Sequence, residues 1–329
     1  MSIKHLTAFC LSVALSVGAT TASAQGDSDP GFASIGAMRT ASSLVVSDDN
    51  YENSRTHFSL GHTFAKGERD IKLHMPQVEV RVPLMEGMGY IDVRVPFIAA
   101  SGDLGHGWGL GDLSLAYTHV FVQDPEWWTV QATAGALLSM TTANRSDGNT
   151  RPLPMAYQSG LGSTDGILGA SAMFKEYVSV AVGYQQPVLR YNQNDYYRSS
   201  YMNDPVYSNS EYEISRKLYR NGDVMARLEG HLVNNRLGIT GGALAMYHLR
   251  NDLYEDRTGA WREIDGSDGF TMSIVGNAFV RFGRYADCKL DITGSFPVIT
   301  RDARPDGLQR QWTIMPRFTY FFNQRNLLF

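Results

Sequence analysis

The sequence has 329 residues, of which 43% are hydrophobic and only 19% charged, against roughly 25% charged residues in an average globular protein. With 32 glycines and 17 tyrosines, this composition excludes wholesale disorder and indicates one large all-β unit rather than two soluble domains. The formal net charge of −4 carries no basic excess, so no nucleic-acid partner is expected.

Residues 1–24 have the layout of a secretory signal peptide. Lys4 precedes an apolar stretch over residues 6–17, and Ala22-Ser23-Ala24 forms a small-residue cleavage site. We therefore expect the mature chain to begin near Gln25, after cleavage at Ala24. Loss of Lys4 then leaves 28 basic against 33 acidic residues, so the net charge becomes −5.

Residues 25–54 follow the leader and show helix-compatible spacing without strong caps. They are predicted to be a periplasmic lead-in, a short plug or a disordered segment. Cys288 is the one cysteine that survives maturation, which excludes an internal disulfide, a zinc cluster and a CxxC redox pair. No cofactor and no metal site are expected.

From residue 55 onward, segments of about ten residues alternate apolar and polar side chains, as strands with one apolar face do. Twelve are predicted, at approximately 55–64, 71–84, 89–100, 110–122, 127–140, 163–174, 177–189, 223–233, 237–250, 268–282, 286–298 and 309–322. Tight connections at 85–88, 123–126, 175–176, 234–236 and 283–285 alternate with long ones at 101–109, 141–162, 190–222, 251–267 and 299–308.

This even count and this alternation of loop lengths are typical of an outer-membrane barrel with short periplasmic turns and long extracellular loops. A soluble β-sandwich also alternates, but the leader, the loop asymmetry and aromatic residues near strand ends favour the membrane. Those aromatic residues are Trp127, Trp128, Tyr177, Tyr247 and Tyr320. The fold class is therefore predicted to be all-β: a single antiparallel transmembrane β-barrel over residues 55–329, in the outer membrane of a Gram-negative bacterium.

The last residue, Phe329, resembles the terminal aromatic assembly signal of outer-membrane barrels. The expected partners are accordingly outer-membrane lipid, the barrel-assembly machinery and a small-molecule solute whose identity the sequence leaves open.

Two glycine-rich stretches are predicted to open strands after long loops. They are Gly109-Leu110-Gly111-Asp112-Leu113-Ser114-Leu115 and Gly160-Leu161-Gly162-Ser163-Thr164-Asp165. With Ala134-Gly135-Ala136 and Val182-Gly183-Tyr184, they resemble the bacterial outer-membrane family named for the meta-pathway of phenol degradation. The resemblance covers most of residues 72–322 and implies a barrel that transports small organic molecules. Gly109, Gly111, Gly160 and Gly162 are predicted to be bends or bulges at the rim, where Asp112 and Asp165 cap or pair.

Charged side chains of both signs are predicted to face the lumen. The candidates are Glu79, Arg81, Asp92, Arg94, Arg227, Glu229, His231, Arg281, Lys289, Asp291 and Arg317. Two hypotheses stay open. The first is a polar pore with Arg81, Arg94, Arg227 and Arg317 at its constriction. The second is an ion-pair lattice that fills the lumen, since opposite charges face each other across the 85–88 turn.

The loop over residues 190–222 carries seven tyrosines. Because tyrosine combines flat apolar area with a hydroxyl, Tyr191, Tyr196, Tyr197 and Tyr201 are candidate contacts for aromatic or sugar-like ligands. The alternatives are a lid folded into the mouth, or a loop that packs on itself.

The leading functional hypothesis is a non-enzymatic channel for passive passage of small, aromatic or hydrophobic molecules. The second is a closed structural, adhesive or ligand-binding barrel. The third is an outer-membrane acyl hydrolase, suggested by the His-x-Ser spacing of His57 and Ser59. Both of those side chains are predicted to point inward, away from lipid acyl chains.

Overall fold

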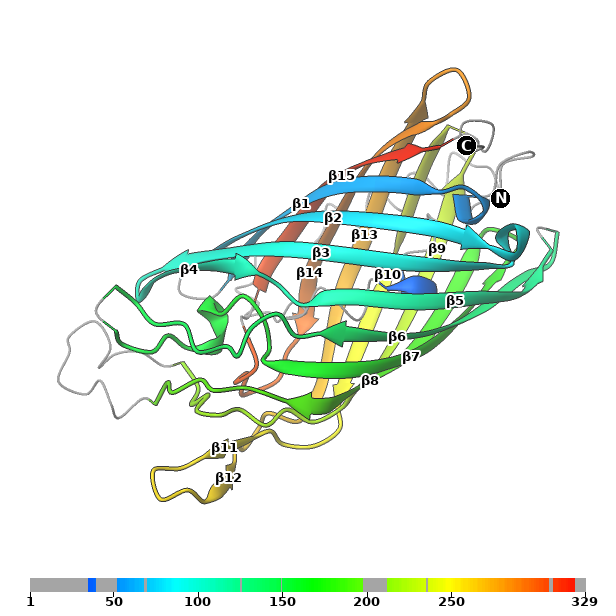
Figure 1. Cartoon of the computed structure of the whole chain (residues 1–329). Coiled ribbons are helices and arrows are strands. Elements are labelled where there is room, and N and C mark those ends of the chain that lie inside the picture. Colours follow the sequence, from blue (N-terminus) through cyan, green and yellow to red (C-terminus); the bar gives the residue numbers. More distant parts are fainter. Residues whose placement is uncertain are drawn as a thin grey trace.

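The computed structural model describes residues 35–39, 52–67, 70–124, 126–148, 150–197, 212–234, 236–307 and 310–322. They form a closed antiparallel barrel (Figure 1). Among the described residues, no helix has the length and apolar character needed to cross a bilayer. The leader, the predicted cleavage site and the terminal Phe329 lie outside the described residues.

The wall of the barrel closes because β1 pairs with both β2 and β15. Its strands are β1 (His57–Gly67), β2 (Lys72–Leu84), β3 (Gly89–Gly102), β4 (Gly105–Leu110), β5 (Leu113–Gln123), β6 (Trp128–Leu138), β7 (Ser163–Phe174), β8 (Val178–Arg190), β9 (Asp223–Val233), β10 (Leu237–His248), β13 (Gly269–Phe282), β14 (Cys288–Ile299) and β15 (Arg310–Phe321). Both β4 and β5 pair with β3, and the Gly111 amide donates to the Pro96 carbonyl at 2.8 Å between them. The two segments together act as one wall strand, so the thirteen-stranded sheet is a twelve-strand barrel.

The predicted fold class and strand order are confirmed, and β7 and β9 have the predicted bounds. The other ends differ by a few residues; β1, for example, covers His57–Gly67 rather than 55–64. Tight turns join the strands at one end of the barrel, here called the turn end. The long connections 139–162, 191–222, 249–268 and 300–309 gather at the opposite end, the loop end.

Two of the predicted long loops contain strands, and in this respect the prediction was wrong. Residues 101–109 are no loop: β3 continues to Gly102, and β4 returns beside it. Three glycines at alternate positions of β4 hide its apolar periodicity, and Gly107 is required because an added Cβ would overlap the backbone carbonyl of Tyr157. Gly109 therefore lies at the end of β4 instead of opening a strand. The loop 251–267 contains a separate hairpin, β11 (Leu253–Glu255) with β12 (Trp261–Glu263), which projects beyond the barrel in Figure 1.

The outer face of the barrel is apolar along its length. Side chains that are at least one third exposed include Leu60, Val78, Leu115, Leu168, Val180, Leu228, Ile239, Ile274, Ile292 and Ile314. The five aromatic residues predicted near strand ends are 37–65% exposed. Because successive residues of a strand point to opposite faces, polar residues turn inward at the alternate positions. An apolar outside with a polar inside is the pattern of outer-membrane barrels and reverses that of soluble proteins.

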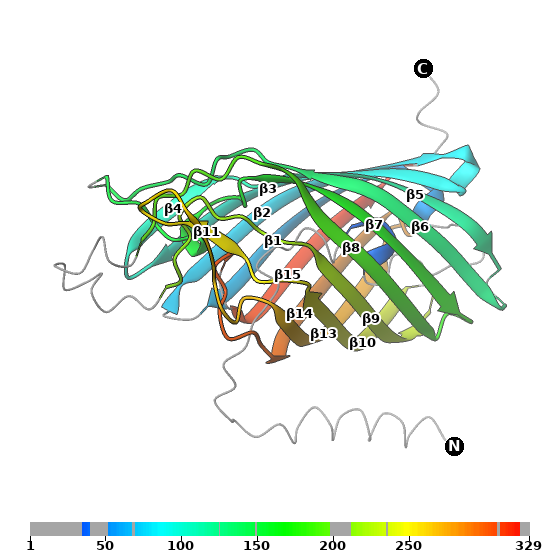
Figure 2. The ribbon, with the colours of Figure 1, turned by 90° about the horizontal axis from the view of Figure 1, so that it is seen from below.

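The interior contains part of the N-terminal segment. The short 3-10 helix η2 (Gly36–Met38) lies inside the ring of strands, where it is the small dark-blue coil of Figures 1 and 2. A second one, η4 (Glu52–Ser54), contacts β2 and β3. Near the loop end, η7 (Met155–Tyr157) places three buried residues against β3 and β4. Short segments from the N-terminal region and from the 139–162 loop therefore lie against the inner face of the wall.

Candidate functional site

The lumen is the candidate functional site, and the charged residues selected from the sequence line it. Exposed fractions are at most 8% for all of them: Glu79, Arg81, Asp92, Arg94, Arg227, Glu229, His231, Arg281, Lys289, Asp291 and Arg317. Their inward direction follows from strand alternation, because each shares its strand face with other buried residues. A role of these side chains in selecting solutes stays a prediction.

Ion pairs between neighbouring strands form a layer toward the turn end. Arg81 lies directly opposite Asp92 in the β2–β3 register and binds it with two hydrogen bonds, at 2.6 and 3.0 Å. Arg317 lies opposite Asp291 in the β14–β15 register and binds it at 3.1 Å. Such two-pronged guanidinium–carboxylate pairs fix orientation as well as charge. The cross-strand pairing that the sequence indicated beside the 85–88 turn is thus present.

The N-terminal segment joins this layer of charges. Arg39 forms an ion pair with Glu79 of β2, whose carboxylate also lies 3.9 Å from Arg317. Glu52 of η4 accepts hydrogen bonds from Arg281 at 3.1 Å and from Lys289 at 2.9 Å. Sequence analysis did not select Arg39 or Glu52, because residues 25–54 show no strand periodicity that would assign them a face. One feature of the sequence does point to Glu52. The strand residues predicted to face inward include more basic than acidic side chains, so an additional acidic side chain is needed to balance their charge.

On the loop-end side of the charged layer, a layer of apolar side chains packs against η2. Ile35 and Met38 belong to one buried cluster with side chains of seven strands, and η2 itself contacts β5, β6, β7 and β8. The other members of the cluster are Ala116, Leu137, Ile167, Ala181, Met225, Leu244, Met246 and Val275. The backbone of η2 is tied to the wall as well. The Ala37 amide donates to Thr133 Oγ1 at 2.7 Å, and Arg227 donates to the Met38 carbonyl at 2.8 Å.

Two glycines allow η2 to lie this close to the wall. Gly36 has φ of +50°, in the left-handed region that glycine tolerates best. Gly169 of β7 leaves room for the Met38 side chain, since an added Cβ would lie 2.5 Å from its sulfur. The apolar layer is therefore built for this segment, and removing the segment would leave an apolar patch inside the barrel.

A third group of side chains packs together at the loop end. Tyr157 of η7 lies in a buried cluster with Ile71, Leu73, Leu104, Leu153, Tyr196 and Tyr212. The Tyr157 and Tyr212 hydroxyls lie 3.4 Å apart, and the Tyr157 hydroxyl accepts the Leu104 amide at 3.3 Å. Part of the 191–222 loop thus packs into the mouth of the barrel.

The tyrosines chosen as ligand candidates occupy different environments. Tyr196 is fully buried in the cluster at the loop end, whereas Tyr191 is 42% exposed. Tyr197 packs against Tyr254, and the Arg257 guanidinium lies 5.0 Å from its ring. Tyr201 lies outside the described residues. Ligand contact by these side chains stays a prediction.

The two glycine-rich motifs meet at the rim, beside the junction of β4 and β5. The Asp112 carboxylate accepts the Leu161 amide at 2.9 Å and the Ser139 hydroxyl at 3.4 Å. Gly160 packs against that carboxylate, and Gly162 has φ of +69° just before β7 begins. These contacts join the 139–162 loop to the end of the split strand.

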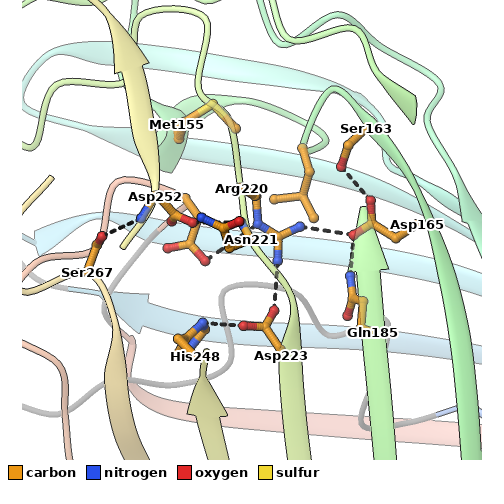
Figure 3. A network of polar contacts seen from close by, with 12 residues as sticks. Met155, Ser163, Asp165, Gln185, Arg220, Asn221, Asp223, His248, Asp252 and Ser267 are labelled. Atoms are coloured by element: carbon orange, nitrogen blue, oxygen red, sulfur yellow. Dashed lines mark hydrogen bonds and ion pairs between the residues drawn. The ribbon is translucent and has the colours of Figure 1, made fainter. Parts of the chain in front are cut away.

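Asp165, the acid of the second motif, belongs to a buried polar cluster at the loop end (Figure 3). Its carboxylate accepts hydrogen bonds from Ser163 at 2.6 Å and from Arg220 at 3.1 Å. Arg220 also binds Asp223 at 3.2 Å and lies 3.8 Å from Asp306. Sequence analysis missed Arg220 and Asp306, since both lie in loops without any periodic pattern.

The hydrolase hypothesis finds its two residues inside the barrel. His57 is 4% and Ser59 is 2% exposed. The Ser59 hydroxyl lies 2.8 Å from that of Thr319, while His57 Nδ1 lies 3.2 Å from the Arg55 carbonyl. These contacts direct the two side chains to different partners, which does not favour a nucleophile activated by its own histidine. Among the described residues, no cluster of three or more His, Cys, Asp or Glu could hold a metal ion.

Comparison with solved structures identifies the class of the fold. The chain is similar to the COG4313 outer membrane channel from Pseudomonas putida F1, with a TM-score of 0.57 and 16% identity over 84% of this chain and 100% of that one. It is also similar, at a TM-score of 0.45 and 8% identity, to the NanC porin, covering 80% of this chain and 98% of that one. The likeness to the first of these structures shows the fold, which is that of an outer-membrane β-barrel.

No protein-family model matches the chain, and no curated protein matches it either. The resemblance to the phenol meta-pathway family accordingly stays a prediction.

Proposed function

We propose that the protein is an outer-membrane channel that lets small aromatic or otherwise hydrophobic molecules diffuse across the membrane. The turn end would face the periplasm and the loop end the exterior. Antiparallel pairing continues around the whole wall, so its strands pair with one another, and the exposed apolar outer face suits hydrocarbon. The proposal does not assign an enzymatic role.

The observation that carries the choice of solute is the apolar layer inside the lumen. A pore for hydrophilic solutes is lined by polar groups or rings of charge. Here ten buried apolar residues, including Met38, Met225 and Met246, meet at one level of the barrel. Methionine side chains are flexible and polarisable, so they adapt to apolar molecules of different shapes. For a solute to pass this level, Ile35 and Met38 must move away from the wall.

Uptake of an apolar dye by Gram-negative cells tests this function, because their lipopolysaccharide leaflet slows such molecules. The probe is N-phenylnaphthylamine, which fluoresces on reaching the inner apolar region. Cells that express the protein should take up the dye several-fold faster than cells with an empty vector. Met225→Gln, which has nearly the same volume, should lower this rate, whereas Gly241→Ala, at a site with no neighbour within 4 Å, should leave it unchanged. Equal uptake with and without the protein would contradict the proposal.

A closed structural or ligand-binding barrel is the second candidate function. It is favoured by the cluster of Tyr157, Tyr196 and Tyr212, which packs the mouth with side chains from two loops. In that case the loops would bind a partner while no solute passes, and dye uptake would equal that of the empty vector.

A further inference from the structure

We propose that Asp252 is a proton-dependent latch that holds the loops at the mouth of the barrel together, closed while its carboxyl is protonated and loosened when it ionises. Asp252 lies just beyond β10, in the loop 249–268, and is buried. The latch goes beyond the channel function proposed above. Only its consequence for solute passage rests on that function.

The geometry places Asp252 where several loops meet. Its carboxylate accepts the Asn221 amide of the 191–222 loop at 2.9 Å. Its own amide donates to Ser267 Oγ at 2.8 Å (Figure 3). Its carbonyl accepts the Ile264 amide at 2.9 Å. The Ser267 carbonyl in turn accepts a hydrogen bond from the guanidinium of Arg301, in the 300–309 loop. Asp252 thus joins its own loop to two other long loops, to 191–222 directly and to 300–309 through Ser267.

The charged groups around Asp252 come from every element packed there. Arg220 comes from the 191–222 loop, and Arg301 and Asp306 come from the 300–309 loop. Strands β7, β9 and β10 contribute Asp165, Asp223 and His248. Both guanidinium groups already pair with other carboxylates: Arg220 with Asp165 and Asp223, and Arg301 with Asp306 at 2.9 Å. With Asp252 ionised, four aspartates would face two arginines, and His248 contacts Asp223 rather than Asp252.

A buried carboxylate without a cation of its own is costly, so it stays protonated or becomes exposed. Burial, together with the nearby Asp306 carboxylate, raises the pKa of Asp252 from its ordinary 3.8 to about 7. Burial alone would also raise the pKa of Asp306, but Arg301 and Arg220 lower it below its usual range, so Asp306 keeps its charge. Of the two neighbouring carboxyls, Asp252 and Asp306, Asp252 is therefore the one that takes up the proton.

The direction of the pH effect follows from these values. Once the loops open, an exposed Asp252 loses its proton near pH 4, whereas in the closed state it keeps the proton until about pH 7. The closed state thus binds one more proton over this range, and its stability falls as pH rises through it. The opening equilibrium should increase up to about tenfold per pH unit between about pH 4 and 7 and level off above.

Hydrogen exchange of the full chain in detergent, read by mass spectrometry between pH 5.5 and 8.5, tests the latch without any flux measurement. After correction for intrinsic exchange rates, peptides covering 212–222 and 249–268 should exchange faster up to about pH 7 and then reach a plateau. Asp252→Asn has the same shape and cannot ionise, so its loops should keep constant protection. Asp265→Asn removes an exposed charge from the same loop and should behave as the wild type.

Three results would overturn the latch: flat exchange in the wild type, an unchanged pH profile in Asp252→Asn, or a profile abolished by His248→Asn but not by Asp252→Asn. The last would assign the proton to the His248–Asp223 pair. Because exchange reports loop opening alone, the latch can hold even if dye uptake disproves the channel, and the reverse is equally true.

Discussion

Glu52 and Lys289 lie 237 positions apart in the sequence, yet their side chains form a buried ion pair at 2.9 Å. Arg281 shares the same carboxylate, so the N-terminal segment is anchored to β13 and β14 by two cations at once. The pair shows that the lattice of charges in the lumen is completed by residues outside the strands.

Replacing Glu52 should destabilise the protein more than the loss of an exposed charge does. In Glu52→Gln, two buried cations lose their anionic partner, and breaking a buried pair in this way costs about 3 kcal/mol. Urea unfolding in detergent micelles, followed by tryptophan fluorescence, measures the change. Glu126→Gln, in an exposed turn, should shift the free energy of unfolding by less than about 0.5 kcal/mol. Equal effects of the two variants would show that the anchor contributes nothing.

Gly169 should tolerate a larger side chain only when Met38 is shortened. Valine at position 169 would push against the Met38 sulfur, and such overpacking costs about 1–3 kcal/mol. The double variant Gly169→Val with Met38→Ala should recover part of that loss, which a double-mutant cycle of unfolding free energies quantifies. Strict additivity would mean that Met38 does not pack on β7.

A charge placed on the outer face tests whether hydrocarbon surrounds the barrel. Leu168 is 60% exposed near the middle of β7, so Leu168→Arg should cost about 2–4 kcal/mol in lipid vesicles. Tyr177→Arg, in the turn after β7, should cost about 0–1 kcal/mol because the interface tolerates charge. If both changes were equally mild, the outer face would be facing water.

Removing the Asp112 carboxylate should detach the two rim motifs. In Asp112→Ala the partly buried Leu161 amide loses its hydrogen-bond acceptor, which should lower the free energy of unfolding by about 1–3 kcal/mol. Proteolysis of the folded protein should then cut the 139–162 loop sooner. The exposed Asp103→Ala serves as the control and should leave the cleavage rate unchanged.

The wall of the barrel could be predicted from the sequence because alternation along each strand encodes two faces. That rule places Arg81, Asp92 and Lys289 on the inner face, where all three are buried. It failed at β4, where glycines at positions 105, 107 and 109 remove every other side chain from the pattern.

The contents of the lumen could not be predicted in the same way. Arg39, Glu52 and Arg220 lie in segments whose conformation is set by partners far away in the sequence, such as Glu79, Lys289 and Asp165. Without a regular alternation of apolar and polar residues, the sequence of a segment does not indicate whether it lies inside the barrel or is exposed to solvent. For the same reason the tyrosines of the 190–222 loop could be counted from the sequence, but Tyr196 could not be assigned to the buried cluster.

Single-channel conductance in planar bilayers tests the central claim most directly. The comparison is between the full chain and a variant that lacks residues 35–55, both checked for folding by their heat-dependent shift on gels. Because η2 and η4 occupy the lumen, we predict small or rare currents for the full chain and several-fold larger currents for the variant. If both proteins insert correctly folded and neither conducts, the barrel is no channel.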